Sequence, residues 1–393
     1  AFATNGDHLI GLGAKARGMG GIGIGMSHGA ESALANPAMI TSVKGTEVSF
    51  GGTVFMPDVE TEIGMGQGSL KSDADLSVIP EVAIAQNVSD NFSWGIGMFG
   101  TAGMGVDYRD KGTSAYSYLD GNYQMVTNLQ LMQFAVPLAY KENGLSFGIA
   151  PVLQYGSLDI NYVTDNDGNP SNGITPIEVG EGVAQDFGMG YNLGLAYEMG
   201  GLMVGASYKS AIDMEYKKVI SGAAQYFGLT YGDHLEQPAE LGVGVSFTEQ
   251  GHTFAFDYKR IKWSDAKGYK DFGWDDQNVF MIGYQFGQDN WALRAGYNYA
   301  KSPIKENNAG ANQNEMMAIN VLNLLGFPAT VESHYTVGGS YAFGKTTSLD
   351  VAYVYAPEAT DHFNQAASGL SAGYNVKTKH SQSSVSAQLN FNF

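Results

Sequence analysis

Residues 9–40 read LIGLGAKARGMGGIGIGMSHGAESALANPAMI. This stretch is apolar and rich in glycine, which allows backbone angles that other residues avoid, so it suits a compact coil packed into a confined space. Only residues 30–35 have a helical pattern, and Pro37 should end it. After residue 47 the sequence alternates between apolar and polar residues as far as its end. We therefore expect the first forty-odd residues to be enclosed by the rest of the chain.

The composition is typical of many strands and tight turns. The chain has 393 residues, with 53 glycines, 23 tyrosines, 11 prolines and 15% charged residues, which favours strands over helices. Because it has no cysteine, disulfides, thiolate metal sites and cysteine nucleophiles are excluded. The net charge of -18 argues against a nucleic-acid partner, which needs a basic surface. No apolar run is long enough for a membrane helix, and a chain that begins at Ala1 is expected to have lost a leader peptide.

Fourteen alternating segments follow the glycine-rich stretch, and they are longer than the usual strands of a soluble β-sandwich. They span residues 46–56, 77–88, 91–103, 125–140, 145–162, 186–199, 202–216, 238–249, 252–263, 277–286, 291–300, 333–343, 347–356 and 381–393. The connections after even-numbered segments are short turns, and those after odd-numbered segments are long. Short turns on one rim and long loops on the other are typical of an outer-membrane β-barrel.

The final segment shows the two faces of such a strand. Every second residue from Ser383 to Phe393 is small or apolar, and the residues between them are Ser384, Ser386, Gln388, Asn390 and Asn392. An apolar face can contact lipid, and a polar face can line a lumen. Fourteen strands enclose a lumen wider than their own side chains fill. The glycine-rich stretch is therefore the candidate plug.

The motifs of the chain resemble those of the FadL family of outer-membrane transporters for long-chain fatty acids and other hydrophobic compounds. They are RGMGG at 17–21, the helical pattern at 30–35, the hatch motif Asn36-Pro37-Ala38, the fourteen segments and the terminal Phe393. The resemblance covers the whole chain. It implies an all-β fold, a transmembrane 14-stranded antiparallel β-barrel in residues 43–393, with an N-terminal hatch, or plug, in residues 1–42. It also implies a monomer in the outer membrane of a Gram-negative bacterium, surrounded by lipid and lipopolysaccharide and assembled by the outer-membrane machinery through Phe393.

The same resemblance implies a route for the transported molecule. Extracellular loops capture it, an interior site beside the hatch binds it, and it leaves through a gap in the wall at the third strand. Gly97, Gly100 and Gly103 in that strand are the candidate lateral gate, because glycine permits a kink or bulge. The family's capture groove lies between the third and fourth long loops, and the candidate residues there are Ile177, Val179, Tyr226, Phe227 and Leu229. Exposed apolar patches usually mark a binding surface, although the loops could instead pack on each other.

Two further features concern the lumen and its mouth. Lys259 and Arg294 are candidate partners for a carboxylate inside the barrel, although either could instead pair with Asp257 or another acidic residue. Residues 312–325 have an amphipathic helical pattern, and we expect them to cap the barrel mouth.

Other sites and functions are disfavoured. The GxGxxG pattern at residues 18–23 lacks the flanking strand and helix of a nucleotide site. Residues 165–168 resemble the start of a calcium loop that lacks its final glutamate, and the seven histidines form no i, i+4 pair for zinc. No cofactor or catalytic motif is present, so we expect a passive importer of a fatty acid, alkane or aromatic compound, not an enzyme. Two alternatives remain: a diffusion porin for polar solutes, and an adhesin or structural barrel.

Overall fold

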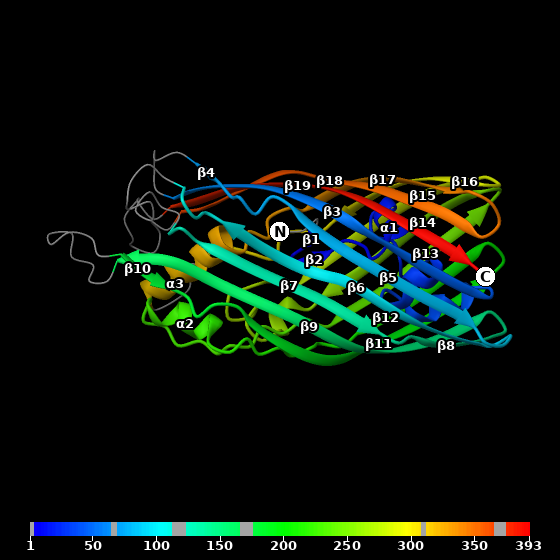
Figure 1. Ribbon diagram of the computed structural model, residues 1–393, viewed down its shortest axis with the longest axis horizontal. Helices are drawn as coiled ribbons and strands as arrows, with labels where there is room; N and C mark the ends of the chain where they lie inside the picture. The colour runs from blue at the N-terminus through cyan, green and yellow to red at the C-terminus, as the bar shows by residue number, and fades with distance from the viewer. Residues whose placement is uncertain (1–3, 64–68, 112–122, 166–175, 308–311, 365–374) are drawn as a thin grey trace.

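The computed structural model describes residues 4–63, 69–111, 123–165, 176–307, 312–364 and 375–393. Fourteen antiparallel strands form the wall, which closes because β19 pairs with β3. Long loops gather at one rim and short turns at the other (Figure 1). The wall strands are β3 (Thr46–Ile63), β5 (Ser77–Asn87), β6 (Phe92–Asp107), β7 with β8 (Val126–Ala135 and Leu138–Glu142), β9 (Leu145–Asp165), β11 (Ala184–Met199), β12 (Leu202–Lys209), β13 (Glu240–Glu249), β14 (His252–Ile261), β15 (Gln277–Gly287), β16 (Trp291–Tyr299), β17 (Ser333–Ala342), β18 (Thr347–Phe363) and β19 (Val376–Asn392).

Each of the fourteen predicted segments overlaps one wall strand, so the predicted barrel is confirmed. The seventh prediction was wrong in length, because β12 ends at Lys209 and not at residue 216. Beyond Lys209 the regular ladder ends, but isolated bridges of Ile212 with Gln237 and of Glu215 with His234 continue the antiparallel register of β12 with β13. Ile212 and Tyr216 continue the alternating pattern, but both side chains are buried. Alternation therefore persisted where the strand pairing became irregular.

The wall strands bury polar side chains and expose apolar ones. In β19, Ser384, Ser386 and Gln388 are buried, whereas Val385 between them is 47% exposed. This arrangement is the reverse of a soluble protein and places the apolar face toward lipid. Among the described residues, no helix is both long enough and apolar enough to cross a membrane.

The long loops carry short elements of their own. They are β4 (Leu70–Lys71), β10 (Pro176–Val179), α2 (Val219–Gln225), η4 (Trp263–Asp265), α3 (Gln313–Val321) and the π-helix η5 (Leu322–Gly326). The helix α3 and η5 occupy the region where the sequence predicted an amphipathic helix. Figure 1 shows α2 and α3 together at the long-loop rim.

The N-terminal segment lies inside the barrel (Figure 1). Its elements are β1 (Thr4–Asn5), β2 (His8–Leu9), α1 (Ala14–Gly18), η1 (Gly29–Ala33) and η2 (Pro37–Ser42). The expectation that Pro37 ends a helix was wrong, because η1 already ends at Ala33 and Pro37 begins η2. Proline suits the first helical position, where its missing N–H is not needed. Asn36 is the N-cap, and its side chain accepts a hydrogen bond from Ala38 N at 3.2 Å.

Candidate functional site

One side of the wall holds the N-terminal segment through main-chain hydrogen bonds. The carboxylate of Asp257 on β14 is fully buried and accepts hydrogen bonds from three consecutive amides: Gly23 N at 2.8 Å, Ile24 N at 2.7 Å and Gly25 N at 2.9 Å. Hydrogen bonds to an ionised carboxylate are about twice as strong as neutral ones. Asp257 is therefore an anchor for the segment, whereas the sequence had placed it only as a possible partner of a lumen cation.

Glycines on four neighbouring strands let the segment touch the wall directly. Gly148 pairs with Gly194, and Gly205 pairs with Gly244. A Cβ atom at Gly148 or Gly194 would collide with the Asn36-Pro37-Ala38 motif, and one at Gly205 would collide with the carbonyl of Ile24. Only glycine leaves room for such a close backbone approach. We call these four glycines together with Asp257 the hatch seat.

The Asn36 side chain joins the two surfaces of this contact. Its Nδ2 donates to Ile24 O at 2.9 Å, within the segment, and to Leu195 O at 3.2 Å, on β11. Asn36 is fully buried, so these bonds satisfy an amide that would otherwise be costly to desolvate. The predicted hatch motif therefore lies at the hatch seat.

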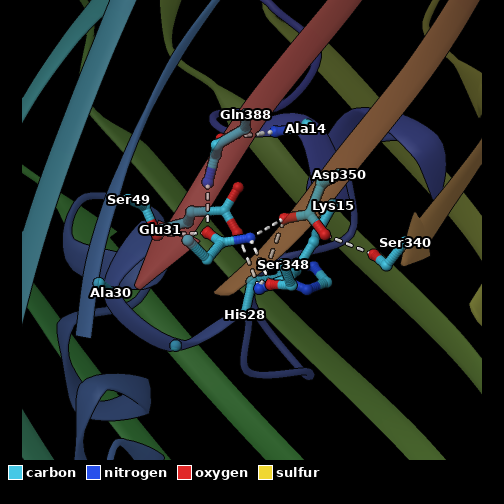
Figure 2. Close-up of polar contacts among 12 residues, drawn as sticks. Ala14, Lys15, His28, Ala30, Glu31, Ser49, Ser340, Ser348, Asp350 and Gln388 are labelled. Carbon is cyan, nitrogen blue, oxygen red and sulfur yellow. Dashed lines mark hydrogen bonds and ion pairs between the residues drawn. The ribbon is translucent and has the colours of Figure 1, made fainter. Parts of the chain in front are cut away.

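Buried ion pairs hold α1 near the short-turn rim. Arg17 donates to Glu81 on β5, and its Nη1 donates to Thr53 on β3 at 2.7 Å. Lys15 lies between Glu31 and Asp350 of β18, with Nζ–O distances of 3.4 and 3.7 Å (Figure 2). Removing one partner of a buried pair leaves an uncompensated charge, which is strongly unfavourable. These pairs therefore fix α1 against both β5 and β18.

The wall between β5 and β6 differs from the rest of the barrel. Their ladder runs from the Asn87–Ser93 pair to the Glu81–Phe99 pair and then stops. A bulge between Gly100 and Ala102 shifts the register of β6 against β7. We call this interruption, between residues 77–80 of β5 and residues 100–107 of β6, the strand gap.

The N-terminal hairpin replaces β5 as a partner within the strand gap. His8 of β2 bridges to Ala102, and Gly103 N donates to Asp7 O at 3.0 Å. Gly100 faces the Ile79 side chain. Of the three predicted gate glycines, Gly100 and Gly103 lie in the strand gap. Gly97 lies in the intact ladder, paired with Ala83.

A cavity of about 70 Å³ lies beside the hatch, and we call it the hatch cavity. Its lining combines apolar residues of the N-terminal segment with charged residues of the wall. Glu240 Oε1 lies 3.0 Å from Lys259 Nζ, and Glu240 Oε2 lies 3.7 Å from Lys209 Nζ. Of the two predicted lumen cations, Lys259 lines this cavity. Arg294 does not, because its guanidinium donates to Gln285 and Ser340 on the neighbouring strands.

A second, apolar cavity of about 60 Å³ lies at the long-loop rim, and we call it the mouth pocket. Phe227 and Leu229 line it, together with Ala318, Ile319, Val321 and Leu322 of α3 and η5. Tyr226 is absent from the lining and 50% exposed. Ile177 and Val179 are absent as well; they belong to β10, which pairs with β9. Among the described residues, the long-loop lining of the mouth pocket therefore comes mainly from the fourth, fifth and sixth long loops.

Several polar residues of the site escaped the sequence analysis. Lys209 and Glu240 sit on separate strands, and only the fold of the hairpin brings Asp7 close enough to Glu240 for an electrostatic interaction. Burial raises the pKa of the Asp7 carboxyl to about 7. The part of the chain that the structure describes has no group of three or more His, Asp or Glu residues able to hold a metal ion. The calcium-like turn that begins at Asp165 extends outside the described residues.

The chain was compared with known proteins. A family model described as "Outer membrane protein transport protein (OMPP1/FadL/TodX)" matches residues 9–393. The long-chain fatty acid transport protein of Escherichia coli K12 is 22% identical, over 85% of this chain and 85% of that protein. The Pseudomonas putida toluene transporter TodX superposes with a TM-score of 0.72 at 19% identity, covering 98% of this chain and 99% of TodX. A Pseudomonas aeruginosa FadL homologue gives a TM-score of 0.73 at 14% identity, covering 99% of this chain and 100% of that one.

Proposed function

We propose that this chain imports hydrophobic small molecules passively, because it belongs to the outer membrane protein transport family (OMPP1/FadL/TodX). The chain is a transport protein of the bacterial outer membrane, and proteins of this family are transporters, not enzymes. The proposed route has three steps: capture in the mouth pocket, binding in the hatch cavity and lateral exit through the strand gap. The division into a hatch of residues 1–42 and a barrel of residues 43–393 is part of this proposal.

One observation carries the proposal: the hatch cavity reaches the strand gap. Thr101 lines the cavity and sits inside the bulge of β6. In a membrane, backbone without a ladder partner is tolerated only where it faces protein or water. Here the hairpin supplies one replacement bond, from Gly103 N to Asp7 O. A molecule in the cavity would therefore lie next to the part of the wall where ladder bonds are missing.

The charges of the hatch cavity support an amphipathic cargo. Lys209 and Lys259 share the single carboxylate of Glu240, and a desolvated cation needs a compensating charge. In this triad of Lys209, Lys259 and Glu240 two cations face one carboxylate, which leaves ammonium N–H donors for an anionic head group. The apolar side chains Leu9, Ile10 and Leu12 of the hatch would cover a tail. We infer a long-chain carboxylate in preference to a plain hydrocarbon.

Both cavities are too small to hold such a molecule in the present conformation. They measure about 60 and 70 Å³, whereas a cavity of about 150 Å³ is needed for benzene. Side chains and loops must therefore move to admit cargo. The conformation described here is a closed one.

The C-terminus supports the proposed dependence on the assembly machinery. Phe393 N donates to Thr46 O at 2.8 Å, which ties the chain end to β3. The Phe393 side chain is 79% exposed at the short-turn rim. We propose that this exposed side chain is the part of the C-terminus that the machinery recognises.

Oleate uptake tests the proposed function and its head-group preference. Cells without their own fatty-acid importer should take up radiolabelled oleate when they make this chain. The variant Lys209→Met/Lys259→Met/Glu240→Gln removes every charge of the triad, and we expect it to bind oleate at least about 10-fold more weakly, since a hydrogen-bonded charge pair is worth this much. Its affinity for the uncharged oleyl alcohol should not change.

A matched control keeps the net charge of the triad. Lys209→Met/Glu240→Gln removes one cation and one carboxylate, so Lys259 remains and oleate binding should persist. Equal losses for oleate and oleyl alcohol in the fully neutral variant would reject the head-group site. Absence of oleate uptake by the parent chain would reject the import of long-chain carboxylates.

A further inference from the structure

Three aromatic side chains of the fifth long loop form a compact cluster above the hatch. The ring centroids of Trp263, Tyr269 and Trp274 lie 4.6 to 4.9 Å from one another. All three side chains are buried. Edge-to-face and tilted aromatic pairs of this kind add to the free energy of burial. We call these three residues the aromatic cluster.

On its outer side the aromatic cluster is linked by hydrogen bonds to Phe272, a residue that lines the mouth pocket. Trp274 Nε1 donates to Asn323 Oδ1 at 2.9 Å, and Asn323 Nδ2 donates to Phe272 O at 2.9 Å. Phe272 lines the mouth pocket and packs edge-on against Tyr231, which lines it as well. Displacement of Phe272 by a molecule in the pocket would therefore act on the Trp274 side of the cluster.

On its inner side the aromatic cluster contacts the hairpin that borders the hatch cavity. The Tyr269 hydroxyl donates to Asp7 Oδ2. The Trp263 ring lies 4.8 Å from the ring of His8, which lines the cavity. It also covers Gly6 so closely that a Cβ there would lie 2.6 Å from Trp263 Cζ2. The cluster thus touches the borders of both cavities.

Asp7 joins this contact to the strand gap. Its carboxylate holds Tyr269, while its main-chain oxygen accepts the Gly103 bond described above. Within the described residues, Asp7 Oδ1 has no hydrogen-bond partner, and it lies 3.5 Å from His8 Nε2. A fully buried carboxylate with one vacant oxygen is held in place mainly by the Tyr269 hydroxyl. Loss of that bond would remove the hydrogen bond that ties the cluster to the hairpin, while Asn5 and His8 keep their bonds to Asn298 and Gln237.

We propose that the aromatic cluster is an inner gate between the mouth pocket and the hatch cavity, and that the hydrogen bond from Tyr269 to Asp7 keeps it closed. The proposal rests on the proposed function for the identity of the two sites. It adds an element that opens between capture and binding. Tyr269 is then a positioning residue, because it acts on the cargo only through Asp7.

Thiol labelling tests the gate without any cargo. The chain has no cysteine, so Ser207→Cys places a single thiol in the lining of the hatch cavity. We expect Tyr269→Phe, which keeps the ring and removes the hydroxyl, to raise the labelling rate of Cys at 207 by N-phenylmaleimide about 10-fold, because one hydrogen bond to a charged group controls the opening. Labelling of a reference thiol introduced by Ala318→Cys in the mouth pocket should stay the same.

A matched control removes a hydroxyl that has no partner. Tyr216 is buried, and its hydroxyl makes no hydrogen bond among the described residues. Tyr216→Phe should therefore leave the labelling of Cys at 207 unchanged. If Tyr216→Phe raises the rate as much as Tyr269→Phe, general loosening of the lumen explains the effect and the gate is rejected.

A double-mutant cycle assigns the effect to the one bond. Asp7→Leu should raise the labelling rate as Tyr269→Phe does, and the double variant should add little, since both substitutions remove the same interaction. Fully additive effects, or unchanged labelling in folded Tyr269→Phe, would overturn the proposal. Because labelling uses no oleate, a failed gate is distinguishable from a failed oleate uptake by the parent chain.

Discussion

The hatch seat and the strand gap are both rich in glycine, yet glycine has opposite consequences in them. At the hatch seat, Gly194 and Gly205 allow the hatch backbone to contact the wall, while the strands around them stay paired. At the strand gap, Gly100 and Gly103 accompany a bulge and the loss of the ladder to β5. The glycine content of a strand therefore does not show whether a wall opens. What matters is whether the backbone at the glycine keeps its ladder partner on the neighbouring strand, as at the hatch seat, or loses it, as at the strand gap.

The bonds between the hatch and the wall divide the hatch into a fixed part and a part that we expect to move. Residues 23–38 are bonded to the hatch seat through Asp257 and Asn36, and α1 is held by buried ion pairs. The hairpin at residues 4–9 has no such anchor on β6, where its contact is one bridge and one main-chain bond, and it is otherwise joined to the wall by bonds to Gln382 and Asn298. We therefore expect transport to move the hairpin and leave the seated part in place.

Deleting residues 1–42 removes the hatch from both the hatch seat and the strand gap, and should have the largest effect of all the changes considered. A fourteen-stranded barrel without its plug has an open lumen. We expect the nearly silent parent chain to become a steadily conducting pore in planar bilayers. Unchanged conductance of a correctly folded deletion variant would show that the segment does not close the lumen.

Valine substitutions in the two regions should separate them. Gly205→Val drives a Cβ into the carbonyl of Ile24, which cannot move away, so we expect a loss of stability of about 1–3 kcal/mol or more. Gly100→Val/Gly103→Val meets the Ile79 side chain at residue 100, which can rotate. This double variant should keep the heat-modifiable gel mobility of a folded barrel, with oleate uptake about 10-fold lower, or about 1.4 kcal/mol on the barrier. Identical stability and uptake for the two variants would remove the distinction.

A smaller effect is expected at the mouth pocket, which lies away from both regions. Phe227→Asp/Leu229→Asp places charge in an apolar lining and makes desolvation of the cargo unfavourable. Uptake should fall a few-fold at limiting oleate and recover at saturating oleate. Tyr226→Asp is the control, because this exposed neighbour does not line the pocket. Equal losses for the control and the double variant would move the capture step elsewhere.

The sequence predicted the barrel well because alternation and loop length are local properties. Val385 and its buried neighbours could be placed on opposite faces from the sequence alone. The end of β12 could not, since residues 210–216 keep the alternation while their pairing is reduced to isolated bridges. A period of two residues shows which side chains share a face, but not which strand pairs with them.

Candidate residues of the proposed site could be named from the sequence only where one loop or strand carried the signal. Phe227 and Leu229 stood out as apolar residues in a loop, and Gly100 and Gly103 as glycines in a strand. The anchor between Asp257 and the amides of residues 23–25 joins parts of the chain more than two hundred residues apart. The same holds for the contact between Tyr269 and Asp7. No local pattern specifies such pairs, because they arise when the barrel closes around the hatch.

Lateral exit through the strand gap is the central claim, and a reversible staple tests it most directly. A Cβ atom at Gly100 would lie 3.8 Å from Ile79 Cβ, which is the usual separation in a disulfide. The chain has no other cysteine, so Ile79→Cys/Gly100→Cys should form one defined bond across the gap. Each single cysteine variant is a control. We predict that the oxidised barrel, folded by gel mobility, takes up oleate at least about 10-fold more slowly, since a closed wall removes the exit, and that a reductant restores the parent rate. Uptake at the parent rate by the fully oxidised barrel would contradict lateral exit and leave passage straight past the hatch.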